Sequence, residues 1–220
     1  MVHGEAGLSL RIARVLAPVT VLGPGRRVVL WVQGCEIGCA GCASVDTWDP
    51  SGGVEVSTDD AAALLADQIR EADLDGLTIT GGEPTSQPRA VADVVGRVRA
   101  HLEPAAVDVL VFTGRAYPAA ARLAPELVES AECVVAGPFR RELPAVGRLV
   151  ASSNQTVHYR SAVARERYEA WLAAQGARLE VTVDQGSVFL IGLPGRDDLG
   201  TFESRLQRRG VDLTEVSWRL

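Results

Sequence analysis

The sequence contains no lysine: all 22 basic residues are arginine, and they are distributed along the whole chain. This absence excludes chemistry that needs a lysine as a Schiff base or as a general base. The sequence also lacks any apolar run near the roughly 20 residues that a membrane-spanning helix requires. It shows no apolar segment followed by a cleavage site near the N-terminus. We therefore expect a cytoplasmic protein with no membrane partner.

Composition and charge indicate the kind of partner and the number of domains. The formal charge at pH 7 is −6, and the arginines form no cluster, which disfavours nucleic acid as the partner. The 220 residues, 47% of them hydrophobic, are sufficient for one sizeable globular domain rather than two.

The hydrophobic pattern alternates between strands and helices. We expect strands over residues 8–16, 28–32, 77–80, 107–113 and 133–136, and helices over 58–72, 88–102, 117–130 and 161–174. Alternation of this kind predicts an α/β fold with parallel strands joined by helical crossovers. The end of the chain differs. It predicts a hairpin of strands 178–183 and 187–191, a helix over 199–209 and a last strand over 214–218.

Three of the four cysteines lie within eight residues. Cys35, Cys39 and Cys42 have the spacing C-x3-C-x2-C directly after the strand expected at 28–32. Thiolates are ligands for iron–sulfur clusters and for zinc. A cubane cluster has four irons, so three cysteines leave one iron open to bind a substrate directly.

Two other interpretations of these cysteines remain open. One is a zinc site completed by Cys133 or by a histidine, although the second C-x2-C pair typical of zinc sites is missing. The other is a ferredoxin-like cluster in which Cys133 is the fourth ligand. Cys133 itself lies in a strand pattern, which is typical of a buried free cysteine.

A second motif, Gly81-Gly82-Glu83-Pro84, follows the strand expected at 77–80. The loops after parallel strands share one end of the sheet, so this turn and the cysteine loop are expected to open on the same mouth. Alone, the turn would have no functional meaning.

Together these motifs resemble the radical S-adenosylmethionine superfamily. The chain is most similar to activases of glycyl radical enzymes, in particular to anaerobic ribonucleotide reductase activases. The similarity runs from about Leu8 to Gln155. Besides the cysteine loop and the Gly81–Pro84 turn, it rests on further stretches: 23–35, Thr47-Trp48-Asp49-Pro50, Phe112-Thr113-Gly114, Gly137-Pro138-Phe139 and Ser152-Ser153-Asn154-Gln155.

The resemblance implies a partial (β/α)6 barrel over residues 1–175, with residues 176–220 as a C-terminal extension (hairpin, helix and strand) packed on this core. It implies a [4Fe–4S] cluster and S-adenosylmethionine as cofactors. S-adenosylmethionine would chelate the open iron, and one electron from the reduced cluster would split it into methionine and a 5′-deoxyadenosyl radical. Flavodoxin or ferredoxin would be the electron donor.

The resemblance also implies roles for residues. Cys35, Cys39 and Cys42 would be the metal ligands and catalytic residues. The residues expected to bind S-adenosylmethionine are Gly41, Gly81, Gly82, Glu83, Pro84, Thr113, Ser153 and Asn154. Among these, the Gly81–Pro84 turn would face the methionine ammonium, and Thr113 the ribose or carboxylate. Ser153, Asn154 and Gln155 would face the nucleoside, and Gly41 would support adenine through its backbone.

The sequence departs from these activases in two places. Ala43-Ser44 stands where they often have His-Asn, and the chain continues past the point near Gln155 where they usually stop. We expect an activase that abstracts hydrogen from a protein partner. The alternatives are a radical enzyme acting on a peptide or small metabolite, whose extension would close over a pocket, and a non-catalytic iron–sulfur or zinc module.

Overall fold

The computed structural model describes residues 7–184, 187–195, 197–213 and 216. A seven-stranded sheet has the order β3-β1-β2-β4-β5-β6-β7, and β8 and β9 form a separate hairpin. The strands are β1 (Ser9–Val19), β2 (Arg27–Val32), β3 (Val54–Ser57), β4 (Gly76–Gly81), β5 (Asp108–Thr113), β6 (Cys133–Ala136), β7 (Thr156–Tyr159), β8 (Leu179–Asp184) and β9 (Ser187–Gly192). The α-helices are α1 (Thr58–Glu71), α2 (Pro88–Leu102), α3 (Tyr117–Leu123), α4 (Pro125–Ser130), α5 (Ala162–Ala173) and α6 (Asp198–Gln207).

Four neighbouring strands, β2, β4, β5 and β6, run parallel, and antiparallel strands flank them on both sides. This arrangement confirms the α/β class predicted from the sequence. The partial (β/α)6 barrel is not confirmed, because the part of the chain that the structure describes shows four parallel strands in a row.

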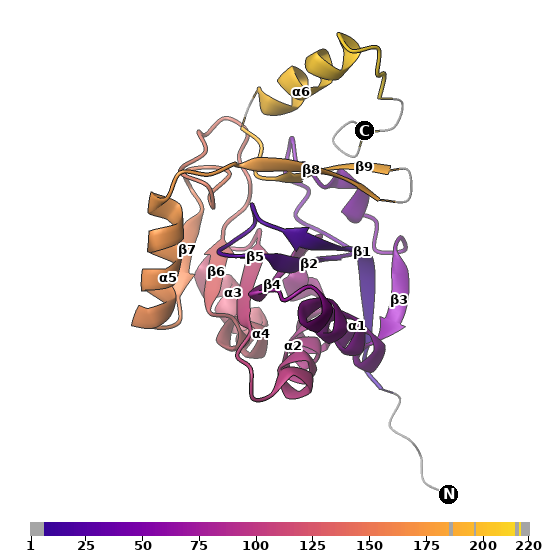
Figure 1. Cartoon of the computed structure of the whole chain (residues 1–220). Helices are drawn as coiled ribbons and strands as arrows, with labels where there is room; N and C mark the ends of the chain where they lie inside the picture. Colours follow the sequence, from indigo (N-terminus) through magenta and orange to yellow (C-terminus); the bar gives the residue numbers. More distant parts are fainter. Residues whose placement is uncertain (1–6, 185–186, 196, 214–215, 217–220) are drawn as a thin grey trace, which may run out of the picture.

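Different elements cover the two faces of the sheet (Figure 1). On one face, α1, α2 and α4 pack on the strands in the largest apolar core. On the other, Phe189 and Ile191 of β9 pack against a cluster that includes Leu16 and Trp31. Strand β2 is buried along all six residues because other elements cover both of its faces, which explains the continuous apolar run 28–32 after Arg27.

The structure corrects several predicted elements. The single helix expected over 117–130 is two short helices, α3 and α4, with Pro125 at the start of the second. Proline lacks the amide hydrogen that a continuous helix needs, so the first helix ends before it. Strands β3 and β7 were not predicted; each has only four residues and little alternation. The last strand, expected over 214–218, falls almost entirely outside the described residues.

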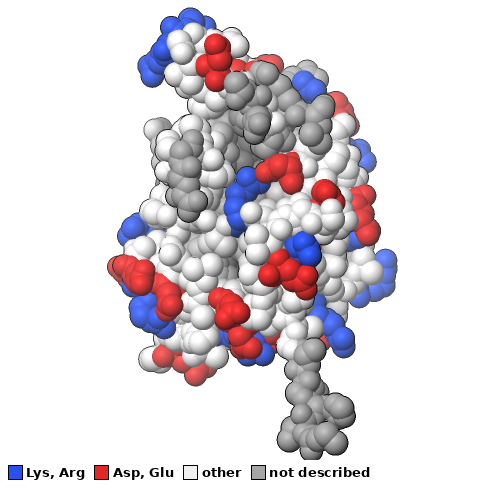
Figure 2. Space-filling model, turned by 90° about the vertical axis from the view of Figure 1, so that its right-hand side faces the viewer, with Lys and Arg blue, Asp and Glu red and all other residues white. Residues whose placement is uncertain are grey.

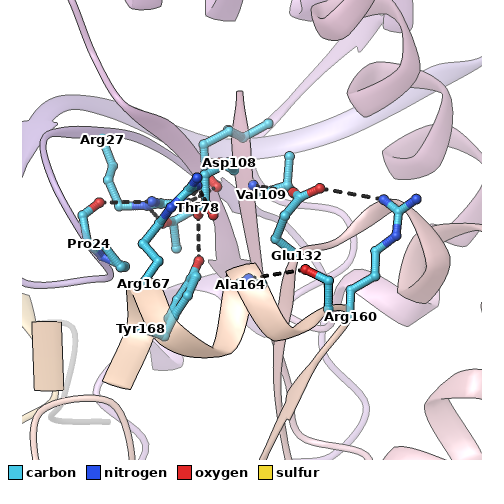
Figure 3. A network of polar contacts seen from close by, with 12 residues as sticks. Pro24, Arg27, Thr78, Asp108, Val109, Glu132, Arg160, Ala164, Arg167 and Tyr168 are labelled. Atoms are coloured by element: carbon cyan, nitrogen blue, oxygen red, sulfur yellow. Dashed lines mark hydrogen bonds and ion pairs between the residues drawn. The ribbon is translucent and has the colours of Figure 1, made fainter. Parts of the chain in front are cut away.

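A buried polar network joins α5 to the ends of the parallel strands that lie away from the cysteine loop (Figure 3). The Asp108 carboxylate pairs with the Arg27 guanidinium at 3.0 Å and accepts a hydrogen bond of 2.6 Å from the Tyr168 hydroxyl. The half-exposed Arg167 guanidinium lies 2.8 Å from the same carboxylate. Arg27 also donates a hydrogen bond of 2.6 Å to the Thr78 hydroxyl. Arg27 and Asp108 are both almost completely buried, so each charge depends on the other.

No helix in the described part of the chain has the length and apolar character needed to cross a membrane. On the face seen in Figure 2, acidic and basic side chains are interspersed, without one large patch of a single sign.

The Asp108 network generates a stability prediction. Replacing Asp108 with Asn leaves the buried Arg27 charge without its counter-ion, so we expect the free energy of unfolding to fall by about 3 kcal/mol. Urea denaturation followed by circular dichroism measures this change. The matched control is Asp67→Asn, which removes an exposed ion pair to Arg70 and should cost less than about 0.5 kcal/mol. Equal losses in the two variants would contradict the role assigned to the network.

Candidate active site: a cavity shared by the cysteine loop and two strand ends

The cysteine loop is held closed at its base by backbone hydrogen bonds. The Gly34 amide donates to the Thr47 carbonyl at 2.8 Å, and the Cys35 amide donates to the Trp48 carbonyl at 3.0 Å. The Gln33 side chain adds a bond of 2.7 Å to the Asp49 carbonyl. The stretch Thr47–Asp49 therefore closes the loop in which Cys35, Cys39 and Cys42 lie.

The turn after β4 is bonded directly to this loop. The Gly82 amide donates to the Val32 carbonyl and the Glu83 amide to the Gly34 carbonyl, both at 2.8 Å. A Cβ atom on Gly82 would lie only 2.3 Å from the Gly34 oxygen, so no other residue fits at this close approach. This geometry confirms that the two motifs open on the same end of the sheet.

The Glu83 side chain is buried and fully hydrogen-bonded within the protein. One carboxylate oxygen accepts from the Thr113 hydroxyl at 2.7 Å and from the amide and hydroxyl of Thr85. The other oxygen accepts from the Gly114 amide at 2.8 Å. Glu83 thus joins the turn to the end of β5, and Thr113 is occupied in the same contact.

A cavity of about 870 Å³ brings most of the predicted site residues together. Its lining includes Cys35, Cys39, Gly41, Cys42, Gly81, Gly82, Glu83 and Thr113. Three predicted residues, Pro84, Ser153 and Asn154, are not part of this lining. The Asn154 amide donates to the Pro138 carbonyl at 2.8 Å, which places it in the loop after β6.

The cavity also contains residues that sequence reasoning did not select. Some come from the part of the chain before residue 158, namely Trp31, Phe112, Phe139 and Arg141. Others come from β9, the following loop and α6. The Arg141 side chain lies against Gly41, where a Cβ atom would be 2.9 Å from its Cδ. Trp31, Phe112 and Phe139 lie in stretches that carry the family resemblance, but the sequence did not assign them to the site, because only the fold brings these separate stretches together.

Among the described residues, no three His, Cys, Asp or Glu side chains are gathered tightly enough to hold a metal ion as they stand. The three thiols nevertheless share the cavity, and Cys42 Sγ accepts a hydrogen bond of 3.4 Å from the Ser44 amide. Burial raises the pKa of the Cys39 and Cys42 thiols above the usual value. The donor set in this cavity fits an iron–sulfur cluster with three cysteine ligands.

Cys133 lies apart from this cavity. It is 1% exposed and packs with Leu110, Val135 and Tyr168 in a separate core cluster. Burial raises the pKa of its thiol far above the usual value. Its position fits a structural cysteine and gives no support to a fourth ligand at the cysteine loop.

This difference can be measured with a thiol reagent. In folded protein without a cluster, at about pH 8, iodoacetamide should modify Cys35, Cys39 and Cys42, which are partly exposed, and leave the buried Cys133 unmodified, because the reagent cannot reach it. Peptide mass spectrometry identifies the modified sites. Protein unfolded in guanidinium is the control and should react at all four cysteines. Modification of Cys133 at the rate of the other three would contradict its burial.

The contacts of Glu83 lead to a second prediction. In Glu83→Gln, an amide group must face either the Gly114 amide or the two hydroxyl donors, so at least one buried donor loses its acceptor. We expect the free energy of unfolding to fall by about 1–3 kcal/mol. The control is Glu36→Gln in the exposed part of the cysteine loop, which should change stability by less than about 0.5 kcal/mol. An unchanged stability in Glu83→Gln would show that these bonds do not hold the turn.

Comparison with known proteins identifies the family of the chain that forms this cavity. Residues 21–158 match the family described as a 4Fe-4S single cluster domain. The chain is 30% identical over 137 residues to the anaerobic ribonucleoside-triphosphate reductase-activating protein of Enterobacteria phage T4, covering 61% of this chain and 85% of that protein. The protein of the same description from Salmonella typhimurium is 30% identical over 146 residues, covering 64% and 94%.

Two further similarities are weaker. The pyruvate formate-lyase 1-activating enzyme of Escherichia coli is 38% identical over 76 residues, which is 34% of this chain and 31% of that enzyme. The crystal structure of QueE from Escherichia coli covers 96% of this chain and 98% of its own, at 14% identity and a TM-score of 0.42. A structural similarity at this level adds nothing to the argument.

The family match confirms the resemblance seen in the sequence, and with it an enzyme whose cofactors are a [4Fe–4S] cluster and S-adenosylmethionine. The chain belongs to the 4Fe-4S single cluster domain family, as a radical S-adenosylmethionine enzyme similar to the activating proteins of anaerobic ribonucleoside-triphosphate reductase.

Proposed function

We propose that this enzyme cleaves S-adenosylmethionine reductively and uses the product radical to take a hydrogen atom from a glycine of a partner enzyme. The cysteine loop and the Gly81–Glu83 turn share one cavity, and this observation carries the proposal. One electron breaks the C5′–S bond and yields methionine and a 5′-deoxyadenosyl radical. Transfer of a hydrogen atom to that radical gives 5′-deoxyadenosine and leaves the radical on the partner's glycine.

Cys35, Cys39 and Cys42 are proposed to hold three irons of the cluster. When bound, the cluster would supply the electron and an open iron, which the amino and carboxylate groups of S-adenosylmethionine would chelate. The protein contributes the loop closed at Thr47–Asp49, which sets where the three thiols lie. Cys133 is too remote in the fold to serve as a fourth ligand without unpacking its core cluster.

The Gly81–Glu83 turn is proposed to bind the methionine ammonium through backbone carbonyls. Two glycines allow a ligand to approach the backbone closely. The Glu83 carboxylate accepts hydrogen bonds from Thr85, Thr113 and Gly114, so we propose that it also holds the turn in place. Thr113 supports Glu83 in the same way.

The other predicted residues have supporting roles. We propose that Gly41 supports adenine through its backbone, since it lines the cavity. Pro84, Ser153 and Asn154 are proposed to shape the neighbouring loops, because they do not line it. The electron donor is proposed to be a flavodoxin or ferredoxin.

The second candidate is a radical enzyme that modifies a peptide or a small metabolite. One observation favours it: residues of β9 and α6, beyond the region matched by the family, line the same cavity as the cysteines. Both candidates share cleavage of S-adenosylmethionine and differ only in the hydrogen donor. The non-catalytic module considered from the sequence is disfavoured, because the relatives are activating enzymes.

The shared chemistry has a direct test. Protein reconstituted anaerobically with iron and sulfide, then given dithionite and S-adenosylmethionine, should release 5′-deoxyadenosine, measured by liquid chromatography and mass spectrometry. Cys39→Ala should lose both the cluster absorbance and the product, because one of three ligands is gone. Cys133→Ala is the matched control and should keep both. Loss of the cluster in Cys133→Ala, or no product from wild-type protein with a full cluster, would refute the proposal.

A further inference from the structure

Part of the cavity lining belongs to the C-terminal extension. The cysteine loop and strand ends form one side, and the opposite side is formed by the end of β9, the loop after it and one face of α6. The family match ends at residue 158, so this second side lies wholly outside the matched region. The residues that hold the cofactors and those that face them across the cavity therefore come from separate parts of the chain.

The hairpin is firmly attached to the core. The Glu180 carboxylate accepts hydrogen bonds from the Thr20 hydroxyl at 2.7 Å and from the Thr20 amide at 3.1 Å. Ile191 is 3% exposed and packs in the same cluster as Trp31. Arg14 stacks its guanidinium on both Trp31 and Phe189, 5.7 and 5.9 Å from the ring centroids. These contacts keep β9 beside the cavity.

Arg14 also connects the hairpin to the cysteine loop, because it forms an ion pair with Asp46, four residues after Cys42.

At the end of β9, Gly192 has φ +127°, and a Cβ atom there would lie 2.1 Å from the Arg178 oxygen. Only glycine fits at this bend, which directs the chain from the hairpin into the loop 193–195 along the cavity.

The side of the cavity formed with β9 is apolar. It combines side chains of the sheet with side chains of the extension: Leu22, Trp31, Phe112, Leu190, Ile191 and Leu193. Several residues on one face of helix α6 also line the cavity, and Leu199 is the apolar residue among them. No residue of α6 is buried, so apolar surface on this helix stays open to a ligand in the cavity.

The size of the cavity limits what fits beside the cofactors. Its volume of about 870 Å³ is near the upper end of the roughly 300–1,000 Å³ typical of small-molecule sites. The cysteine side must also hold the cluster and S-adenosylmethionine. The space that remains suits a single side chain or ring rather than a folded surface.

We infer that the C-terminal extension forms a substrate compartment beside the cofactor site, and that this compartment takes an apolar side chain or ring next to the hydrogen atom that is removed. The inference rests on the proposed function, because it places a hydrogen donor opposite S-adenosylmethionine. The apolar group belongs either to a segment of a partner polypeptide or to a free small molecule.

Calorimetry on the reconstituted full chain, with S-adenosylmethionine bound, tests the compartment and distinguishes the two sources. The probes are acetyl-Phe-Gly-Phe amide for a peptide source, indole for a small molecule, and acetyl-Ser-Gly-Ser amide as the polar comparison. We expect at least one apolar probe to bind with a negative heat-capacity change, the signature of apolar burial, and more tightly than the polar peptide. Stronger binding of the Phe peptide than of indole identifies the polypeptide source, and the reverse identifies the small molecule.

Two variants locate the binding. Leu193→Asn and Leu199→Asn place a polar group of similar size in the compartment and should each weaken the apolar probe by about tenfold. Leu199 lies on a helix with no buried residue, so its replacement leaves the core intact even if Leu193→Asn unfolds. The matched control is Val183→Asn on the same hairpin, where the side chain is 67% exposed and does not line the cavity. It should leave probe binding unchanged.

Failure of this inference is distinguishable from failure of the proposed function, because calorimetry measures binding rather than turnover. If wild-type protein cleaves S-adenosylmethionine but binds neither apolar probe at about 1 mM, the compartment is refuted alone. Equal affinities in Leu199→Asn and Val183→Asn refute it as well. If the probe binds as expected but no 5′-deoxyadenosine forms, the proposed function is refuted instead.

Discussion

The geometry of the site depends on the buried carboxylate of Glu83. A charged group taken out of water is stable only when donors satisfy its oxygens, and here those donors come from the Gly81–Thr85 region and from Thr113 and Gly114. The same turn is bonded through its backbone to Val32 and Gly34, directly before the first cysteine. The Glu83 carboxylate therefore joins the ends of β4 and β5, and the backbone of the same turn joins them to the start of the cysteine loop.

The opposite ends of these strands are joined by a different buried charge pair. Arg27 at the start of β2 pairs with Asp108 at the start of β5, and the Tyr168 hydroxyl joins α5 to the same carboxylate. The parallel strands are thus connected by buried polar contacts at both ends. Because α5 directly precedes the hairpin in the chain, this contact also sets where the extension starts on its way to the cavity.

Two different parts of the chain line the cavity, one for the cofactors and one for the substrate. The region matched by the family supplies the three cysteines and the glycine turn, to which we assign the binding of the cofactors. The extension supplies apolar residues of β9 and α6 on the facing side, where a hydrogen donor would lie. A change in the extension can therefore alter the substrate without altering the cysteine loop.

The sequence by itself determined the chemistry and the α/β class. The spacing of Cys35, Cys39 and Cys42 and the turn at Gly81–Glu83 are local patterns, so each is legible over a few residues. Tertiary structure alone decided that Glu83 binds Thr113, that Cys133 lies in a separate core, and that Leu193 lines the same cavity as the cysteines. These outcomes depend on contacts between residues far apart in the chain, and short-range periodicity carries no information about such contacts.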